Sequence, residues 1–210
     1  IALWHAGNNP AKWKKQGMFI SDGTDPRYDW QGFVPHDQKP HMKNPSRGYI
    51  GSANQHPTTS DYPYFLSEFY WASFRWNQIH TRLDTLHSAT VQNMLDIQLD
   101  NRSVFAEKTM PIILRTWKNH LRNDLEKQAF TILSNWDYEM EGHSPAPTMY
   151  RYWYALLEEL TWEDDLGKDN DKFIWPYRDK MMELILTNPE SHWFYNKSTT
   201  QIETFSHLSR

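Results

Sequence analysis

The chain has 210 residues, a length that suits one ordinary domain or one domain with an appended piece. Its formal net charge of −4 and its pI near 6.2 provide no electrostatic footprint for nucleic acid or an anionic membrane, and no stretch approaches the ~20 apolar residues of a membrane-spanning helix. Cysteine is absent, which excludes thiol catalysis, disulfides and cysteine-based zinc sites.

Residues 1–63 contain most of the glycine and proline of the chain. This punctuation disfavours regular helix and favours short extended pieces joined by turns. Strands are predicted at about residues 1–5 and 49–52, and Asp22-Gly23 suits a tight turn. The first part of the chain is therefore expected to be irregular and poor in β structure.

After Pro63 the apolar residues recur at helical spacing, and Thr90 is suited to cap a helix at its N-terminus. Helices are predicted at about residues 64–86, 91–99, 103–117, 123–136, 148–160 and 176–187, with a short one after Pro189; the acidic stretch 162–172 is predicted to be a solvated loop. The predicted fold class is mainly α: an irregular segment (1–63) followed by a helical bundle (64–210), in which residues 64–160 form the core.

An ordered set of short motifs gives the chain a family resemblance. The motifs are Asp22-Gly23, Trp30-Gln31-Gly32-Phe33-Val34-Pro35, Asn44-Pro45-Ser46-Arg47-Gly48-Tyr49-Ile50-Gly51-Ser52-Ala53-Asn54-Gln55, Asp61-Tyr62-Pro63, and downstream Arg75, Thr90, Gln98-Leu99-Asp100, Pro111 and Trp136-Asp137. Each motif is short, but together, over about residues 7–160, they resemble the penicillin acylase (penicillin amidase) family and its acyl-homoserine-lactone and cephalosporin relatives.

The resemblance implies an amidohydrolase whose precursor cleaves itself to expose a serine, which attacks the acyl carbon with its own α-amine as base. That serine lies well upstream of the Asn-Pro-Gly-Tyr motif in the family, whereas only some forty residues precede the motif here. The chain is therefore expected to be an interior piece of the large subunit, including its inserted helical domain, without the nucleophile and inactive alone.

The same resemblance implies the partners and location of the intact enzyme. The partners are the small subunit, the rest of the large subunit and a small-molecule acyl amide, with no nucleic acid and no membrane, in a periplasmic or secreted protein. No organic cofactor is implied. Family members often hold a structural calcium near the position of Leu66, but leucine has no side-chain oxygen; any calcium is therefore expected elsewhere in the intact enzyme.

Asn54 matches the family asparagine that donates a hydrogen bond to the oxyanion of the tetrahedral intermediate. The small residues Gly51-Ser52-Ala53 before it suit a close approach by substrate or by another backbone. From the residues alone a polar turn is the favoured interpretation of Asn54, and the aligned motif favours the oxyanion role. Arg75 matches a family arginine that helps hold the nucleophile region and this asparagine in place, and the alternative is an ordinary surface salt bridge. Tyr49 and Asn44 are interpreted as structural.

The sequence also suggests a metal site and a binding module. The 10 His residues suggest a metal site, but His80 and His87 are seven residues apart, ~10 Å along a helix and too far to share one ion. The acidic residues 165–171 lack the central glycine and the closing glutamate of a calcium loop. From a different functional class, the 15% aromatic content, with 11 Trp, suits a non-catalytic helical binding module for peptides or sugars.

Overall fold

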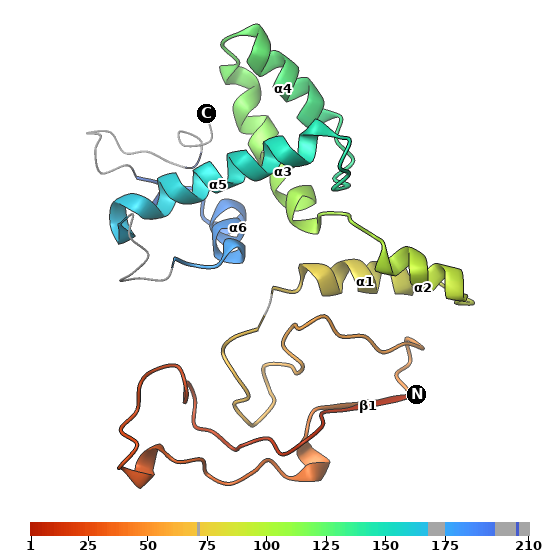
Figure 1. Ribbon diagram of the computed structural model, residues 1–210, viewed down its shortest axis with the longest axis vertical. Coiled ribbons are helices and arrows are strands. Elements are labelled where there is room, and N and C mark those ends of the chain that lie inside the picture. Colours follow the sequence, from red (N-terminus) through yellow and green to blue (C-terminus); the bar gives the residue numbers. More distant parts are fainter. Residues whose placement is uncertain (71, 168–174, 196–204, 206–210) are drawn as a thin grey trace. The chain divides into compact units, whose positions relative to one another are not determined.

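The computed structural model describes residues 1–70, 72–167, 175–195 and 205 of the chain. The chain forms two compact units, Ile1–Gln98 and Leu99–Arg210 (Figure 1). The fold is mainly α, as predicted, with six α-helices and one two-stranded sheet in its described part. The first two helices belong to the first unit, although the sequence texture changes already after Pro63.

The first unit begins with an antiparallel pair of short strands, β1 (Ala2–Trp4) and β2 (His41–Lys43). In their register Leu3 lies opposite Met42. This pairing confirms the strand predicted near the start of the chain. Two 3₁₀ turns, η1 (Pro26–Tyr28) and η2 (His36–Gln38), lie on the long connection between the strands.

The strand predicted at residues 49–52 is wrong. After β2 the chain turns away from the sheet, with Asn44 in the left-handed region (φ 43°) and Gly48 N–H donating to Pro45 O at 2.9 Å. β1 has only three residues, and all of them pair with β2. Residues 49–52 therefore have no strand partner in the described structure, and they pack by their side chains instead.

Helix α1 (Phe74–Asp84) begins ten residues later than predicted from the helical pattern of residues 64–86. The residues before it bond to another part of the first unit: Phe65 forms a β-bridge with Lys12, and Lys12 Nζ donates to Leu66 O at 3.2 Å. These long-range contacts satisfy backbone groups that a helix would need for itself. Tertiary pairing therefore overrides the local periodicity here.

Helix α2 (Val91–Gln98) begins where the sequence predicts it. Asn93 N–H donates to Thr90 Oγ1 at 3.2 Å, and Thr90 N–H donates to Asn93 Oδ1 at 3.0 Å. This reciprocal pair satisfies two backbone donors at the start of the helix, as a capping box does. The predicted role of Thr90 as N-cap is confirmed.

The described residues of the second unit form four α-helices and two 3₁₀ turns: α3 (Val104–Trp117), η3 (Lys118–His120), α4 (Asp124–Ser134), α5 (Pro145–Leu166), α6 (Arg178–Thr187) and η4 (His192–Phe194). Side chains of Ser103, Asn123 and Ser144 cap the first turns of α3, α4 and α5. Each cap offers an oxygen to an otherwise unpaired backbone N–H. The four predicted helices are confirmed, with shifted ends.

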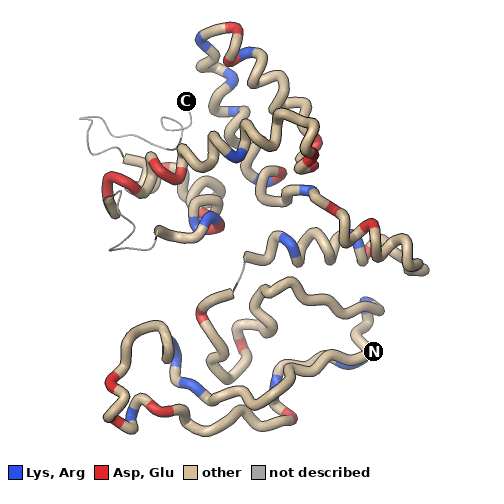
Figure 2. Tube along the Cα trace, in the orientation of Figure 1, with Lys and Arg blue, Asp and Glu red and all other residues tan. Residues whose placement is uncertain are grey.

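Helix α5 is longer than predicted and includes the start of the acidic stretch that was expected to be a loop. Figure 2 shows acidic residues, in red, toward its C-terminal end, where negative charge is unfavourable to the helix dipole. Trp162 is 1% exposed at this end, and its burial offsets that cost. The loop prediction is therefore wrong up to Leu166, and residues 168–172 lie outside the described residues.

The hydrophobic core lies in the second unit, where α5 contacts α4 and η4, and α3 contacts α4 and α6. Its residues are Ala106, Met110, Ile113, Leu133, Trp136, Ala146, Tyr150, Tyr154, Leu157, Trp162, Met181, Leu184, Ile185, Phe194 and Phe205. The prediction that residues 64–160 form the core is wrong for 64–98, because no described hydrophobic side chain there is fully buried. Helix α1 presents a mixed aromatic and polar face instead of an apolar stripe.

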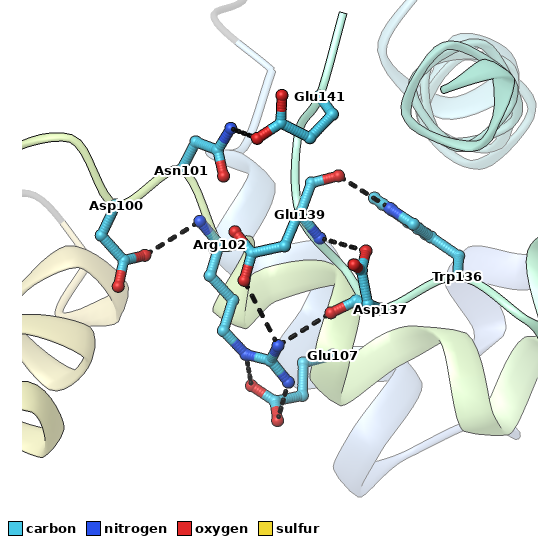
Figure 3. Close-up of polar contacts among 8 residues, drawn as sticks. All are labelled: Asp100, Asn101, Arg102, Glu107, Trp136, Asp137, Glu139 and Glu141. Atoms are coloured by element: carbon cyan, nitrogen blue, oxygen red, sulfur yellow. Dashed lines mark hydrogen bonds and ion pairs between the residues drawn. The ribbon is translucent and has the colours of Figure 1, made fainter. Parts of the chain in front are cut away.

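Arg102 ties the start of α3 to the segment that leads into α5 (Figure 3). Its guanidinium bonds both carboxylate oxygens of Glu107, at 2.9 and 3.4 Å, and donates to Asp137 O at 2.8 Å. Glu139 Oε1 lies 3.6 Å from the same group. This network raises the pKa of Arg102, chiefly through the hydrogen bonds to Glu107.

In the described part of the chain, no helix is long and apolar enough to cross a membrane.

Candidate functional site

Asn54 and Arg75, the two residues that the sequence singles out, contact each other in the first unit. Arg75 Nη2 donates to Asn54 Oδ1 at 2.5 Å. Arg75 is the second residue of α1, and Asn54 is the penultimate residue of the long motif, with a left-handed φ of 66°. Both side chains are exposed, whereas Ala53, the motif residue directly before Asn54, is buried. Burial of Ala53 thus fixes the backbone immediately before the exposed Asn54 side chain.

This contact fixes which way the Asn54 amide points. A guanidinium has donors only, so Asn54 must turn its oxygen toward Arg75. The amide nitrogen then points away from Arg75 as a free donor group, and none of the described residues accepts a hydrogen bond from it. Left-handed backbone is tolerated by asparagine better than by most residues, so the conformation suits this residue type.

Gly51 lies directly against the indole ring of Trp76. A Cβ atom added to Gly51 would be 2.6 Å from Cζ3 of that ring, whereas carbon atoms are in optimal contact at about 3.5–4.0 Å. The small side chain was predicted to admit a substrate or another backbone; in the structure it admits an aromatic side chain of α1. Gly51 therefore lets the motif approach the helix closely.

We expect Gly51→Ala to lower the free energy of unfolding by about 1–3 kcal/mol, because the added methyl group must displace Trp76 or the motif backbone. Gly23→Ala is the matched control: it is in the same unit, and its added Cβ would meet nothing within 4 Å. That variant should be neutral or slightly stabilising. Urea unfolding followed by tryptophan fluorescence measures both, and equal stability of the two variants would contradict the packing role.

Tyr49 contacts the same helix one turn further along. Its hydroxyl forms a hydrogen bond with His80 Nδ1 and lies 3.3 Å from Asp84 Oδ1. Partial burial, and then the nearby Asp84 carboxylate, raise the pKa of Tyr49, so the hydroxyl keeps its proton. Tyr49, predicted to be structural, therefore holds the motif to α1 through polar contacts of its hydroxyl.

The Arg47 guanidinium lies over the rings of Tyr49 and Trp76. Its Cζ atom lies 5.1 Å from the ring centroid of Tyr49 and 5.5 Å from that of Trp76. Its Nε also donates to Tyr49 O at 3.0 Å. Cation–π contacts of this kind stabilise a solvent-facing site by about 0.5–1 kcal/mol. Arg47 thus belongs to the packing of the motif on α1.

Asn44, at the other end of the motif, holds the sheet to the turn after it. Its N–H donates to Ile1 O at 2.8 Å, and its Oδ1 accepts from the main-chain nitrogen of Ile1 at 2.6 Å. Both bonds are made to backbone, and they fix Asn44 in its left-handed conformation. This arrangement agrees with the structural role predicted for Asn44.

Comparison with known sequences decides the family. A profile of the penicillin amidase family matches residues 1–210, which is the whole chain. The chain belongs to the penicillin amidase family. The resemblance noted from its motifs is thereby confirmed.

Curated relatives of this penicillin amidase chain are similar at low identity. Acyl-homoserine lactone acylase QuiP of Pseudomonas syringae pv. tomato is 25% identical over 175 residues, which are 78% of this chain and 21% of that protein. QuiP of Pseudomonas aeruginosa is 29% identical over 102 residues (49% and 12%), and penicillin G acylase of Escherichia coli is 27% identical over 127 residues (55% and 15%). The chain therefore spans about a fifth or less of the length of these relatives.

No metal site is evident in the part of the chain that the structure describes. Among the described residues, no group of three or more His, Asp or Glu side chains is placed to hold an ion. His80, weighed from the sequence only as a metal ligand, instead contacts Tyr49, and its ring stacks on Trp76 at 5.6 Å between centroids. Leu66, the residue that the family resemblance places near a calcium site, accepts a hydrogen bond from the ammonium group of Lys12 through its backbone oxygen.

Sequence reasoning missed the helix residues that receive the motif. Trp76, His80 and Asp84 are spaced by four and share one face of α1. Arg47 in the turn of the motif, and Tyr49 and Gly51 after it, contact residues of this face. The four-residue spacing on α1 was the signal that could have singled out this face.

Proposed function

We propose that the intact protein hydrolyses an acyl amide to a carboxylic acid and an amine, and that this chain supplies Asn54 as a donor to the oxyanion of the tetrahedral intermediate. The observation that carries the proposal is the hydrogen bond from Arg75 to Asn54 Oδ1. It leaves the side-chain N–H groups of Asn54 directed away from the arginine. Family membership supplies the class of reaction.

The chemistry suits an amide donor. When a nucleophile adds to an amide carbonyl, negative charge develops on the carbonyl oxygen, and a donor already in position stabilises the transition state by ~3 kcal/mol. A neutral amide offers that bond without titrating. By holding Oδ1, Arg75 prevents the amide from presenting its own oxygen to the developing charge.

The nucleophile that we propose is the exposed serine of the processed large subunit, outside this chain. Asn54 and Arg75 are exposed here, and oxyanion donors act best in a site closed to water. We therefore propose that the small subunit and the rest of the large subunit cover them. The names of the relatives favour small acyl amides as substrates, of the acyl-homoserine lactone or penicillin G type, and we extend the proposal to a periplasmic or secreted enzyme.

The alternative, a non-catalytic aromatic binding module, is not favoured. The family profile covers the whole chain, and the aromatic rings around the motif are used internally: Trp76 packs on Gly51, and Tyr49 bonds to His80.

The proposal is tested by assaying the intact protein and the 210-residue chain in parallel with chromogenic phenylacetyl and fatty-acyl anilides. We expect the intact protein to release the aniline and the chain alone to release none, because the chain carries a donor but no nucleophile. Absence of turnover in the processed intact protein over a range of acyl lengths would contradict the amidase proposal. Turnover by the chain alone, abolished by Asn54→Ala, would contradict the division of roles.

A further inference from the structure

One face of α1 carries a continuous series of contacts to the motif. His80 lies between Trp76, on which its ring stacks with an interplanar angle of 6°, and the hydroxyl of Tyr49. The next residue on this face, Asp84, lies 3.3 Å from the same hydroxyl. The imidazole is therefore held by a ring on one side and a polar contact on another.

One arrangement of the protons lets Tyr49, His80 and Asp84 all form hydrogen bonds within the cluster. Tyr49 has a single O–H, which it donates to the Asp84 carboxylate, an acceptor only. Its oxygen then accepts from His80, whose Nδ1 carries the ring hydrogen. His80 is thus a donor to Tyr49, and the chain of bonds runs from His80 through Tyr49 to Asp84.

The motif is tied to α1 at two points on either side of Gly51. Tyr49 is bound near the C-terminal end of the helix by His80, and Asn54 is bound near its N-terminal end by Arg75. His80 and Arg75 are five residues apart, about 7.5 Å along the helix axis, and the two motif residues are also five apart. Because both ties hold the same short segment of backbone, we expect the loss of one to displace the other.

We propose that His80 is a positioning residue for the oxyanion donor: it holds Tyr49, and through Tyr49 it sets the place of Asn54 beside Arg75. This inference rests on the proposed role of Asn54. It assigns to His80 no contact with the substrate. Its function is to keep the motif from sliding along α1, since a shift of about 1 Å at a catalytic group can cost up to about 100-fold in rate.

The test is His80→Phe in the intact enzyme. Phenylalanine keeps a ring to stack on Trp76 but cannot donate to Tyr49. We expect kcat to fall about tenfold with KM within about twofold, because the donor is misplaced in the transition state while substrate binding is retained. His80→Asn, whose side-chain nitrogen can replace Nδ1 as donor, should recover most of kcat. His87→Phe, an exposed histidine just beyond α1, is the matched control and should leave kcat unchanged.

The decisive measurement repeats His80→Phe in an Asn54→Ala background. If His80 acts through Asn54, it should cause no further loss of kcat there. An equal loss in both backgrounds, or failure of His80→Asn to recover activity in a folded enzyme, would overturn the positioning role. An unchanged kcat in His80→Phe, in an enzyme whose kcat is lowered by Asn54→Ala, would also overturn the positioning role. If Asn54→Ala itself leaves kcat unchanged, the proposed function fails first, and His80 has no oxyanion donor to position.

Discussion

Replacing Asn54 with alanine in the intact enzyme should lower kcat by about 10²–10³-fold with less effect on substrate binding. The reason is that an amide aimed at an oxyanion interacts mainly when charge has developed on the substrate. Alanine removes the donor and leaves Arg75 without its acceptor. Steady-state kinetics on a chromogenic acyl amide, with purified and fully processed enzyme, measures the effect.

Two further substitutions at Asn54 separate donor chemistry from a turn-forming role. The φ of 66° favours glycine over any other residue, so a mere turn former predicts that Asn54→Gly retains activity. Donor chemistry predicts that glycine is as poor as alanine. Asn54→Asp keeps the shape of the side chain and a stronger bond to Arg75 but loses the N–H, and we expect it to be at least as inactive. A well-folded glycine or aspartate variant with near-full kcat would refute the oxyanion assignment.

Asn44→Ala is the control for a structural asparagine in the same motif. It removes the acceptor for the nitrogen of Ile1 and places alanine at a left-handed φ of 43°. We expect a lower unfolding temperature with kcat per folded enzyme nearly unchanged. An effect on kcat as large as that of Asn54→Ala would mean that the whole motif, and not Asn54 in particular, determines the rate.

The helices could be predicted from the sequence where their signals are local. Thr90, Ser103 and Asn123 each offer a capping oxygen within three residues of the donor that they satisfy, so the start of each helix is encoded nearby. The late start of α1 could not be predicted in this way. It depends on Lys12, which pairs with Phe65 from 53 residues away.

The candidate site was only partly predictable for a related reason. The family motif singles out Asn54 and Arg75, and the structure brings them into contact. The contact of Tyr49 with His80 joins residues 31 apart, and no single motif contains both. From the sequence, His80 is therefore compared only with His87, whereas its contact partner in the structure is Tyr49, in the loop before α1.

Arg75→Leu is expected to lower kcat by about 10- to 100-fold with KM little changed, because the Asn54 amide loses the donor that fixes its orientation. An unheld amide turns between two states, and only one of them presents N–H to the oxyanion. The alternative account makes Arg75 an ordinary surface salt bridge. Among the described residues the contact partner of Arg75 is the neutral Asn54 and not a carboxylate, so loss of a salt bridge would not explain such a fall in rate.

Arg75→Lys and the Asn54→Ala/Arg75→Leu double variant make this prediction discriminating. Lysine can donate one hydrogen bond to Asn54 Oδ1, but its ammonium group lacks the rigid planar geometry of the guanidinium. Arg75→Lys should therefore recover part of the lost kcat. If Arg75 acts by orienting Asn54, the double variant should be no slower than Asn54→Ala alone. A further full loss in the double variant would show that Arg75 serves the reaction by a second route, through the nucleophile region, because an arginine that only orients Asn54 has nothing left to orient once the amide is gone.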